Sequence, residues 1–80
     1  MFAWRKRNET ISAGAQFRRT MPSKASEIAQ VVAVSSDRTG IPHVRFRLRV
    51  ERPDRPAVQS AERTLSLAAF KQLFPERLAH

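Results

Sequence analysis

The sequence predicts a mainly β protein, a strongly bent antiparallel sheet of four to five strands with one short C-terminal helix. The first observation behind this prediction is residues 43–50, HVRFRLRV, which alternate polar and apolar side chains without a break. The second is a run of small and β-branched residues at 27–35, and the third is a helix signature at 66–75. Alternation with period two is typical of a half-buried strand, and β-branched residues favour strands.

Two strands are predicted in the first half of the chain. Residues 16–19 form a short strand that directs Phe17 inward, and a loop containing Pro22 follows it. The second strand, residues 27–35, has apolar side chains on both faces. Its core face is expected to carry Ile28, Val32 and Val34, and its other face Ala29, Val31 and Ala33.

A hairpin is predicted to join this strand to the alternating one. Residues 37–40, DRTG, have the composition of a turn, and Pro42 opens the third strand where a missing donor costs least. The register that aligns the two apolar faces pairs Val34 with Val44, Val32 with Phe46 and Ile28 with Val50. The same register places Ala33, Val31 and Ala29 opposite Arg45, Arg47 and Arg49.

The three arginines of the alternating strand form a cationic stripe on the face opposite its apolar side chains. In the expected register most of the stripe lacks acidic neighbours, because only Glu27 and Glu51 approach it, both beside Arg49. Two interpretations follow. Either the arginine stems shield small apolar neighbours while the charged heads stay solvated, or the stripe binds an external anion.

The remaining elements complete the prediction. Residues 51–56, with two prolines, are expected to form a polar loop, and a weakly patterned strand follows at 58–65. Ser66 has the character of a helix N-cap, residues 67–74 carry apolar side chains at helical spacing, and Pro75 ends the helix.

Length and composition predict one small domain. With 80 residues and no cysteine, the chain has neither disulfides nor thiolate zinc sites to stabilise it, which favours a cytoplasmic location. Residues 1–13 are predicted to be a flexible basic N-terminal arm, and residues 14–80 a single small β-rich domain. Alternatively, the arm inserts Trp4 against a base or a membrane interface. No apolar run approaches the roughly 18 residues of a membrane span, so no membrane partner is expected.

The charge points to a polyanionic partner. Fifteen Lys and Arg residues against seven Asp and Glu give a formal net charge of +8, a balance typical of nucleic-acid-binding proteins. Same-face residues on a strand lie about 6.6 Å apart, comparable with neighbouring phosphates, so the stripe can track a backbone. The predicted nucleic-acid-binding residues are Arg45, Arg47 and Arg49, extended by Arg18, Arg19, Arg52 and Arg63.

Enzymatic chemistry is not expected. His43, close to Ser35, Ser36 and Asp37 across the turn, marks the one place where the sequence brings a nucleophile, a base and an acid together. A surface histidine without a catalytic role explains this placement better. Scattered carboxylates and two glycines predict no metal, no cofactor and no phosphate-binding loop.

The order of elements from residue 14 to residue 74 resembles a small SH3-like barrel of the KOW or Tudor type. The resemblance is architectural, because the KOW glycine pattern and the aromatic cage of Tudor domains are not found. It implies binding of RNA, DNA or peptides in preference to catalysis. The competing architecture is an open antiparallel sheet with the helix on one face.

The sequence therefore predicts a non-enzymatic, cytoplasmic bacterial or phage protein that binds nucleic acid with low sequence specificity. The alternative is a protein-interaction or regulatory adaptor module that binds an acidic partner or itself, as a monomer or weak homodimer.

Overall fold

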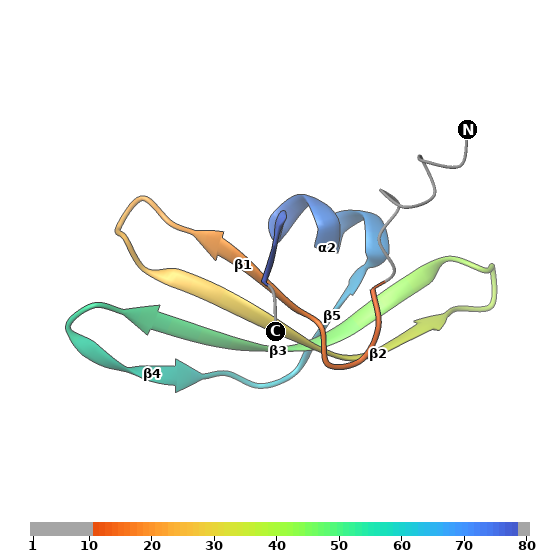
Figure 1. The fold of residues 1–80 in the computed structure, drawn as a ribbon. Helices are drawn as coiled ribbons and strands as arrows, with labels where there is room; N and C mark the ends of the chain where they lie inside the picture. The colour runs from red at the N-terminus through yellow and green to blue at the C-terminus, as the bar shows by residue number, and fades with distance from the viewer. Residues whose placement is uncertain (1–10, 79–80) are drawn as a thin grey trace.

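Residues 11–78 are described by the computed structural model, and they form six strands and one helix (Figure 1). The strands are β1 (Gln16–Thr20), β2 (Ser26–Ser36), β3 (Pro42–Arg52), β4 (Arg55–Gln59), β5 (Arg63–Ser66) and β6 (Glu76–Leu78). Helix α2 (Leu67–Leu73) lies between β5 and β6 in the chain. The predicted mainly β class with one short helix near the C-terminus is confirmed.

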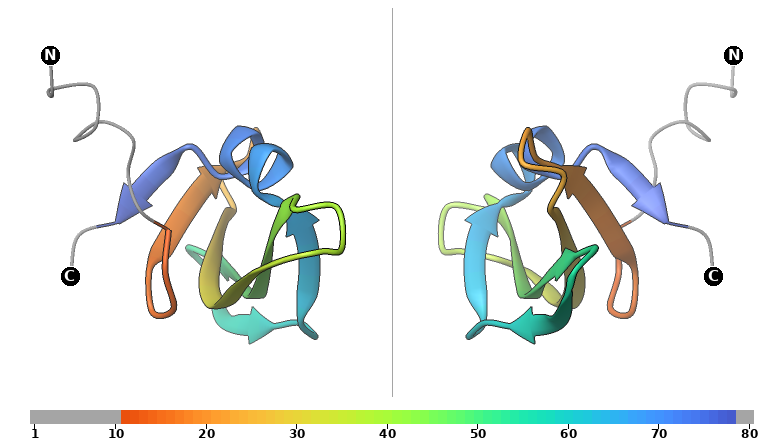
Figure 2. Two further views of the ribbon diagram at one scale, coloured as in Figure 1. Left: turned by 90° about the vertical axis from the view of Figure 1, so that its right-hand side faces the viewer. Right: turned by 90° about the vertical axis from the view of Figure 1, so that its left-hand side faces the viewer.

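The strands form one antiparallel sheet in the order β4-β3-β2-β1-β6, and β5 pairs with β3 as well. Strand β3 is long enough for β4 to pair near its end and β5 near its start, on the edge that faces away from β2. The sheet bends strongly, and α2 lies across its concave side (Figure 2). The face toward α2 is called the inner face below, and the opposite one the outer face.

The predicted hairpin forms, but its register holds only near the turn. Val34 pairs with Val44 and Ala33 with Arg45 as expected, and then a β-bulge at Val32 shifts the pairing by one residue. Beyond the bulge, Val31 pairs with Phe46 instead of Val32. The predicted pairing of Ile28 with Val50 is therefore wrong, because Ile28 lies opposite Arg49.

The bulge also exchanges the predicted faces of the first half of β2. Ala29 and Val31 point inward and are buried, whereas Gln30 is exposed on the outer face. An unbroken alternation would have placed Gln30 on the core side with Ile28 and Val32. Burying an amide without a hydrogen-bond partner costs about 1–3 kcal/mol, and one extra residue in the strand avoids that cost.

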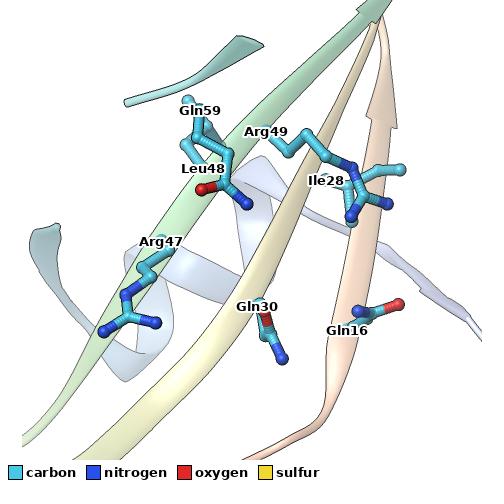
Figure 3. A pocket seen from close by; sticks show the side chains of 7 residues that line it. All are labelled: Gln16, Ile28, Gln30, Arg47, Leu48, Arg49 and Gln59. Carbon is cyan, nitrogen blue, oxygen red and sulfur yellow. The ribbon is translucent and has the colours of Figure 1, made fainter. Parts of the chain in front are cut away.

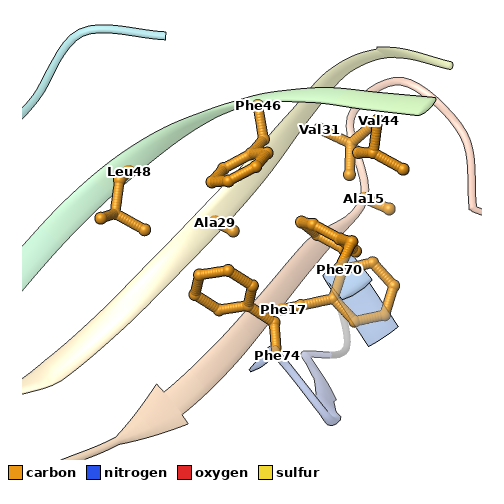
Figure 4. Packing of buried hydrophobic residues seen from close by; sticks show 9 residues of the cluster. All are labelled: Ala15, Phe17, Ala29, Val31, Val44, Phe46, Leu48, Phe70 and Phe74. Carbon is orange, nitrogen blue, oxygen red and sulfur yellow. The ribbon is translucent and has the colours of Figure 1, made fainter. Parts of the chain in front are cut away.

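The core lies between the inner face and α2, and aromatic rings dominate it (Figure 4). Phe70 of α2 is fully buried and contacts Phe17, Phe46 and Phe74, with ring centroids 5.3, 5.2 and 5.2 Å away. The Phe17 ring meets it edge-on, at 86°. Such T-shaped contacts add to the stabilisation from buried apolar area. The predicted inward position of Phe17 is thus confirmed.

The C-terminal helix begins as predicted. The Ser66 hydroxyl accepts a hydrogen bond from the Ala69 amide at 3.2 Å, which makes Ser66 the N-cap, and the helix ends at Leu73.

The chain between β3 and the helix differs from the prediction. The expected loop at 51–56 shrinks to the two residues between Arg52 and Arg55, and the expected strand at 58–65 divides into β4 and β5. Strand β6 was not predicted.

The predicted arm lies largely outside the described residues, including Trp4. Within the described part, Ile11 packs against the core cluster, and the Gly14 amide donates to the Val31 carbonyl at 2.9 Å. These contacts attach the chain to the sheet from residue 11. In the described range 11–78, no helix is long and apolar enough to cross a membrane.

Candidate nucleic-acid interface

The arginine stripe lies on the outer face of the sheet. Val44, Phe46 and Leu48 of β3 are at most 4% exposed and belong to the inner face. The arginines that alternate with them therefore point to the outer face. The side chains of Arg45 and Arg47 are accordingly 54% and 58% exposed. Period-two alternation therefore gives this strand one buried apolar face and one exposed cationic face.

The remaining predicted site residues do not all join this stripe. Arg18 lies opposite Ile28 and shares the outer face. Arg19 and Arg63 belong to the inner face, because they lie opposite Glu27 and Phe46. Arg52 lies at the end of β3, directly opposite Arg55 across the hairpin turn. The structure thus brings together four of the seven predicted arginines on one face.

A single glutamate contacts the first two arginines of the stripe. Glu62, from the connection between β4 and β5, has one carboxylate oxygen 3.4 Å from Nε of Arg45 and the other 3.2 Å from Nε of Arg47. The expectation that these arginines meet no acidic side chain is therefore wrong. Glu62 was not predicted as a partner of these arginines, because a continuous strand at 58–65 gave no reason for its side chain to lie beside Arg45 and Arg47.

The third arginine of the stripe pairs within its own strand. Nε of Arg49 donates to the Glu51 carboxylate at 2.9 Å, as the sequence predicted, because residues two apart on a strand share a face. Glu27 does not contribute to the stripe, since it pairs with Arg19 on the inner face.

Arg18 forms a two-point ion pair at the margin of the outer face. Its Nε and Nη2 donate to the two carboxylate oxygens of Glu76 at 3.1 and 2.7 Å. The hydrogen bond, together with the charge of the partner, raises the pKa of Arg18 and lowers that of Glu76. Glu76 belongs to β6, the strand that sequence reasoning missed.

Positive charge remains in excess after these pairs form. Within residues 11–78, six basic side chains take part in no ion pair, namely Lys24, Arg38, Arg52, Arg55, Arg63 and Lys71. Arg45 and Arg47 share one carboxylate, so that cluster also carries one surplus charge. The surface is consequently complementary to an anionic partner.

Figure 3 shows the side chains that surround Arg47 and Arg49 on the outer face. A depression of only about 10 Å³ lies between these two arginines, Ile28 and three glutamines, Gln16, Gln30 and Gln59. That volume holds about one water molecule. Around Arg47 and Arg49 the surface is therefore suited to a partner that lies across it. Beside Arg45 the same face carries a larger hollow of about 340 Å³, lined by Ala33, Ser35, His43, Arg45 and Thr64.

His43 lies beside the β2–β3 turn. Its Nδ1 is 3.0 Å from the Ile41 carbonyl oxygen, to which it donates, and 3.9 Å from the Asp37 carboxylate. That carboxylate is occupied by the turn itself, because it accepts from the Thr39 amide at 2.8 Å and the Ile41 amide at 3.0 Å. The hydrogen bond from the Thr39 hydroxyl, followed by the one from the Ile41 amide, lowers the pKa of Asp37. These contacts assign Asp37 to the turn.

The inner face carries a separate groove of about 350 Å³ beyond the end of α2. Apolar side chains of Phe46, Leu48 and Phe74 line it together with Arg19 and Arg63. Arg19 also lies over the Phe74 ring, with its guanidinium carbon 5.6 Å from the ring centroid. The two predicted arginines of the inner face therefore both line this groove, together with Glu27, the ion-pair partner of Arg19.

A scan of protein-family models, a search of curated proteins and a search of solved structures each return no match to the chain. Among residues 11–78, no group of three or more His, Cys, Asp or Glu side chains has an arrangement that holds a metal ion.

Proposed function

We propose that this protein is a non-enzymatic nucleic-acid-binding protein and that Arg45, Arg47 and Arg49 on the outer face carry its phosphate contacts. The observation that supports this most is the pair of guanidinium groups on one shared carboxylate, since Glu62 neutralises only one of them. Arg18 extends the interface on the same face, and Arg52 lies at the end of the same strand.

The existing ion pairs do not prevent such contacts. The side chains of Arg45, Arg47 and Glu62 are between 37% and 58% exposed. Ion pairs at such exposure contribute about 0.2–1 kcal/mol each, and a phosphate offers the same guanidinium groups equivalent acceptors. Alternate positions on the strand are about 6.6 Å apart, so successive arginines meet successive phosphates.

The architecture supports the same proposal. We assign the bent sheet, with α2 across its concave side, to the SH3-like small barrels, which bind nucleic acids or peptides far more often than they catalyse reactions.

The test is the salt dependence of binding to a fluorescein-labelled oligonucleotide, measured by anisotropy. The Arg45→Ala/Arg47→Ala variant should lower the slope of log K against log salt by at least about 0.7 for a single strand, because the guanidinium group that Glu62 leaves unneutralised is lost. The matched control is Arg38→Ala/Lys71→Ala, which removes the same charge elsewhere. If the wild-type protein shows no binding at about 50 mM salt, where counterion release favours it most, the proposal is wrong.

The inner-face groove supports a second candidate, a module that binds an acidic protein segment. Its apolar lining accommodates an apolar side chain, while Arg63 has no ion pair within residues 11–78 and is open to a carboxylate. Recovery of one partner after nuclease treatment, lost on Arg63→Glu and retained on Arg47→Glu, would favour this candidate over nucleic-acid binding.

A further inference from the structure

The outer face carries three glutamine side chains whose positions suggest base recognition. We propose that Gln16, Gln30 and Gln59 select among the bases of a single-stranded nucleic acid whose phosphates contact the arginine stripe. This inference rests on the proposed function and adds to it a ligand class and a basis for base preference, where the sequence alone predicted low specificity.

The strand register places the amides in line with the arginines. Gln16 of β1 lies opposite Gln30 of β2, which in turn lies opposite Arg47 of β3. One step along the strands, Arg49 lies opposite Gln59 of β4. Cross-strand partners share a face, so four neighbouring strands present amides beside guanidinium groups (Figure 3).

None of the three amides is used within the fold. Among residues 11–78, the side chains of Gln16, Gln30 and Gln59 form no hydrogen bond. A glutamine amide offers a donor and an acceptor side by side, the combination that pairs with the edge of adenine. Arginine only donates hydrogen bonds, which suits phosphate oxygens because they only accept at neutral pH. The amides add the acceptors that base edges also require.

The bulge at Val32 is what exposes the central amide. Without it, Gln30 would face α2, and an apolar Val31 would lie opposite Arg47. With it, Gln30 and Ile28 both belong to the outer face, and Ile28 is the buried apolar floor between the amides and Arg49. β-bulges commonly re-aim a side chain at a functional site.

The width of this surface favours unpaired bases. The amides span β1 to β4, which are three interstrand spacings or about 14 Å apart. The major groove of B-form DNA is about 12 Å wide and admits a helix or two strands. The outer amides therefore cannot reach base edges in a duplex together, whereas the exposed bases of a single strand can lie across the face.

The experiment compares fluorescein-labelled oligo(dA), oligo(dC), oligo(dT) and oligo(rA), each about 16 nucleotides long, with a mixed-sequence duplex of the same length. The variant is Gln16→Ala/Gln30→Ala/Gln59→Ala in the full chain. Gln72→Ala is the control, because this exposed glutamine lies on α2. Unchanged thermal melts confirm that each variant folds, and the two adenine oligomers distinguish RNA from DNA.

We expect the wild-type protein to bind single strands more tightly than the duplex. We also expect at least about a fivefold range in Kd among the DNA homopolymers, the effect of one good bidentate contact. The triple variant should reduce that range to less than about twofold and keep the salt slope, whereas Gln72→Ala should change neither. Equal binding of all homopolymers, tighter binding of the duplex, or an unchanged range in the triple variant would overturn the inference while leaving nucleic-acid binding intact. Absence of binding to every probe would overturn both.

Discussion

Under the proposed function, Glu62 competes with phosphates for the stripe, and its substitution gives the sharpest prediction. The substitution Glu62→Gln keeps the shape of the side chain and removes the one carboxylate shared by Arg45 and Arg47, 3.4 and 3.2 Å from their Nε atoms. One further guanidinium group then becomes free for a phosphate, because Glu62 neutralises only one of the two. Each added contact with a single strand steepens the slope of log K against log salt by about 0.7, so the slope steepens by up to about 0.7.

That slope translates into a measurable change in affinity. Between about 200 and 50 mM salt, the affinity of Glu62→Gln for a single strand should rise up to about 2.6-fold more than that of the wild-type protein. Anisotropy titrations at four or five salt concentrations measure both slopes. The substitution should leave folding nearly unchanged, because exposed ion pairs contribute less than about 1 kcal/mol.

The control for this prediction is Glu27→Gln, which removes the same charge from the inner face. Glu27 pairs with Arg19, so its substitution frees one arginine on the side of the sheet away from the stripe. If Glu27→Gln steepens the salt dependence as much as Glu62→Gln, net charge alone explains the effect and the stripe is not the interface. Weaker binding by Glu62→Gln would show that Glu62 positions the arginines instead of competing for them.

Three predictions concern stability. Phe70→Ala should lower the free energy of unfolding by about 3–5 kcal/mol in urea titrations, because Phe70 is fully buried among three other phenylalanines; a loss below about 1 kcal/mol would contradict this core. Gly40→Ala should cost about 1 kcal/mol, since Gly40 has a φ of +83° that disfavours a side chain although there is space for one. Asp37→Ala should be less stable than wild type near pH 6. The pKa of Asp37 is lowered in the fold, so this stabilisation is present above the unfolded pKa of about 3.9 and disappears as the pH falls through the folded value. If the difference in Tm between wild type and Asp37→Ala stays constant down to pH 2, the Asp37 carboxylate does not stabilise the turn.

Local patterns were enough to predict most of the secondary structure. The alternation along β3, the turn before Pro42 and the capping role of Ser66 depend on residues close in the chain, where backbone geometry and short-range hydrogen bonds decide the outcome. Strand β6 has only three residues, and its sequence carries no periodicity that would distinguish it from a C-terminal tail.

The register and the ion pairs required long-range information. The second strand is apolar on both faces, so period two alone allowed either face to become the core. Gln30 was the one local signal for the correct choice, because burying its amide would leave it without a partner. Glu62 offered no comparable signal, since its position depends on how β4 and β5 divide along β3.

The sequence by itself determined the β class, the alternating strand with its arginines, the helix start and the excess of positive charge, because all of these follow from local periodicity, capping chemistry and composition. Only the tertiary structure decided which residues surround the arginines. The β-bulge brought Gln30 and Ile28 to the outer face, the division of the last strand brought Glu62 to Arg45 and Arg47, and the pairing of β6 with β1 brought Glu76 to Arg18. Each of these depends on pairing between strands that are distant in the chain, which is fixed by burying one common core.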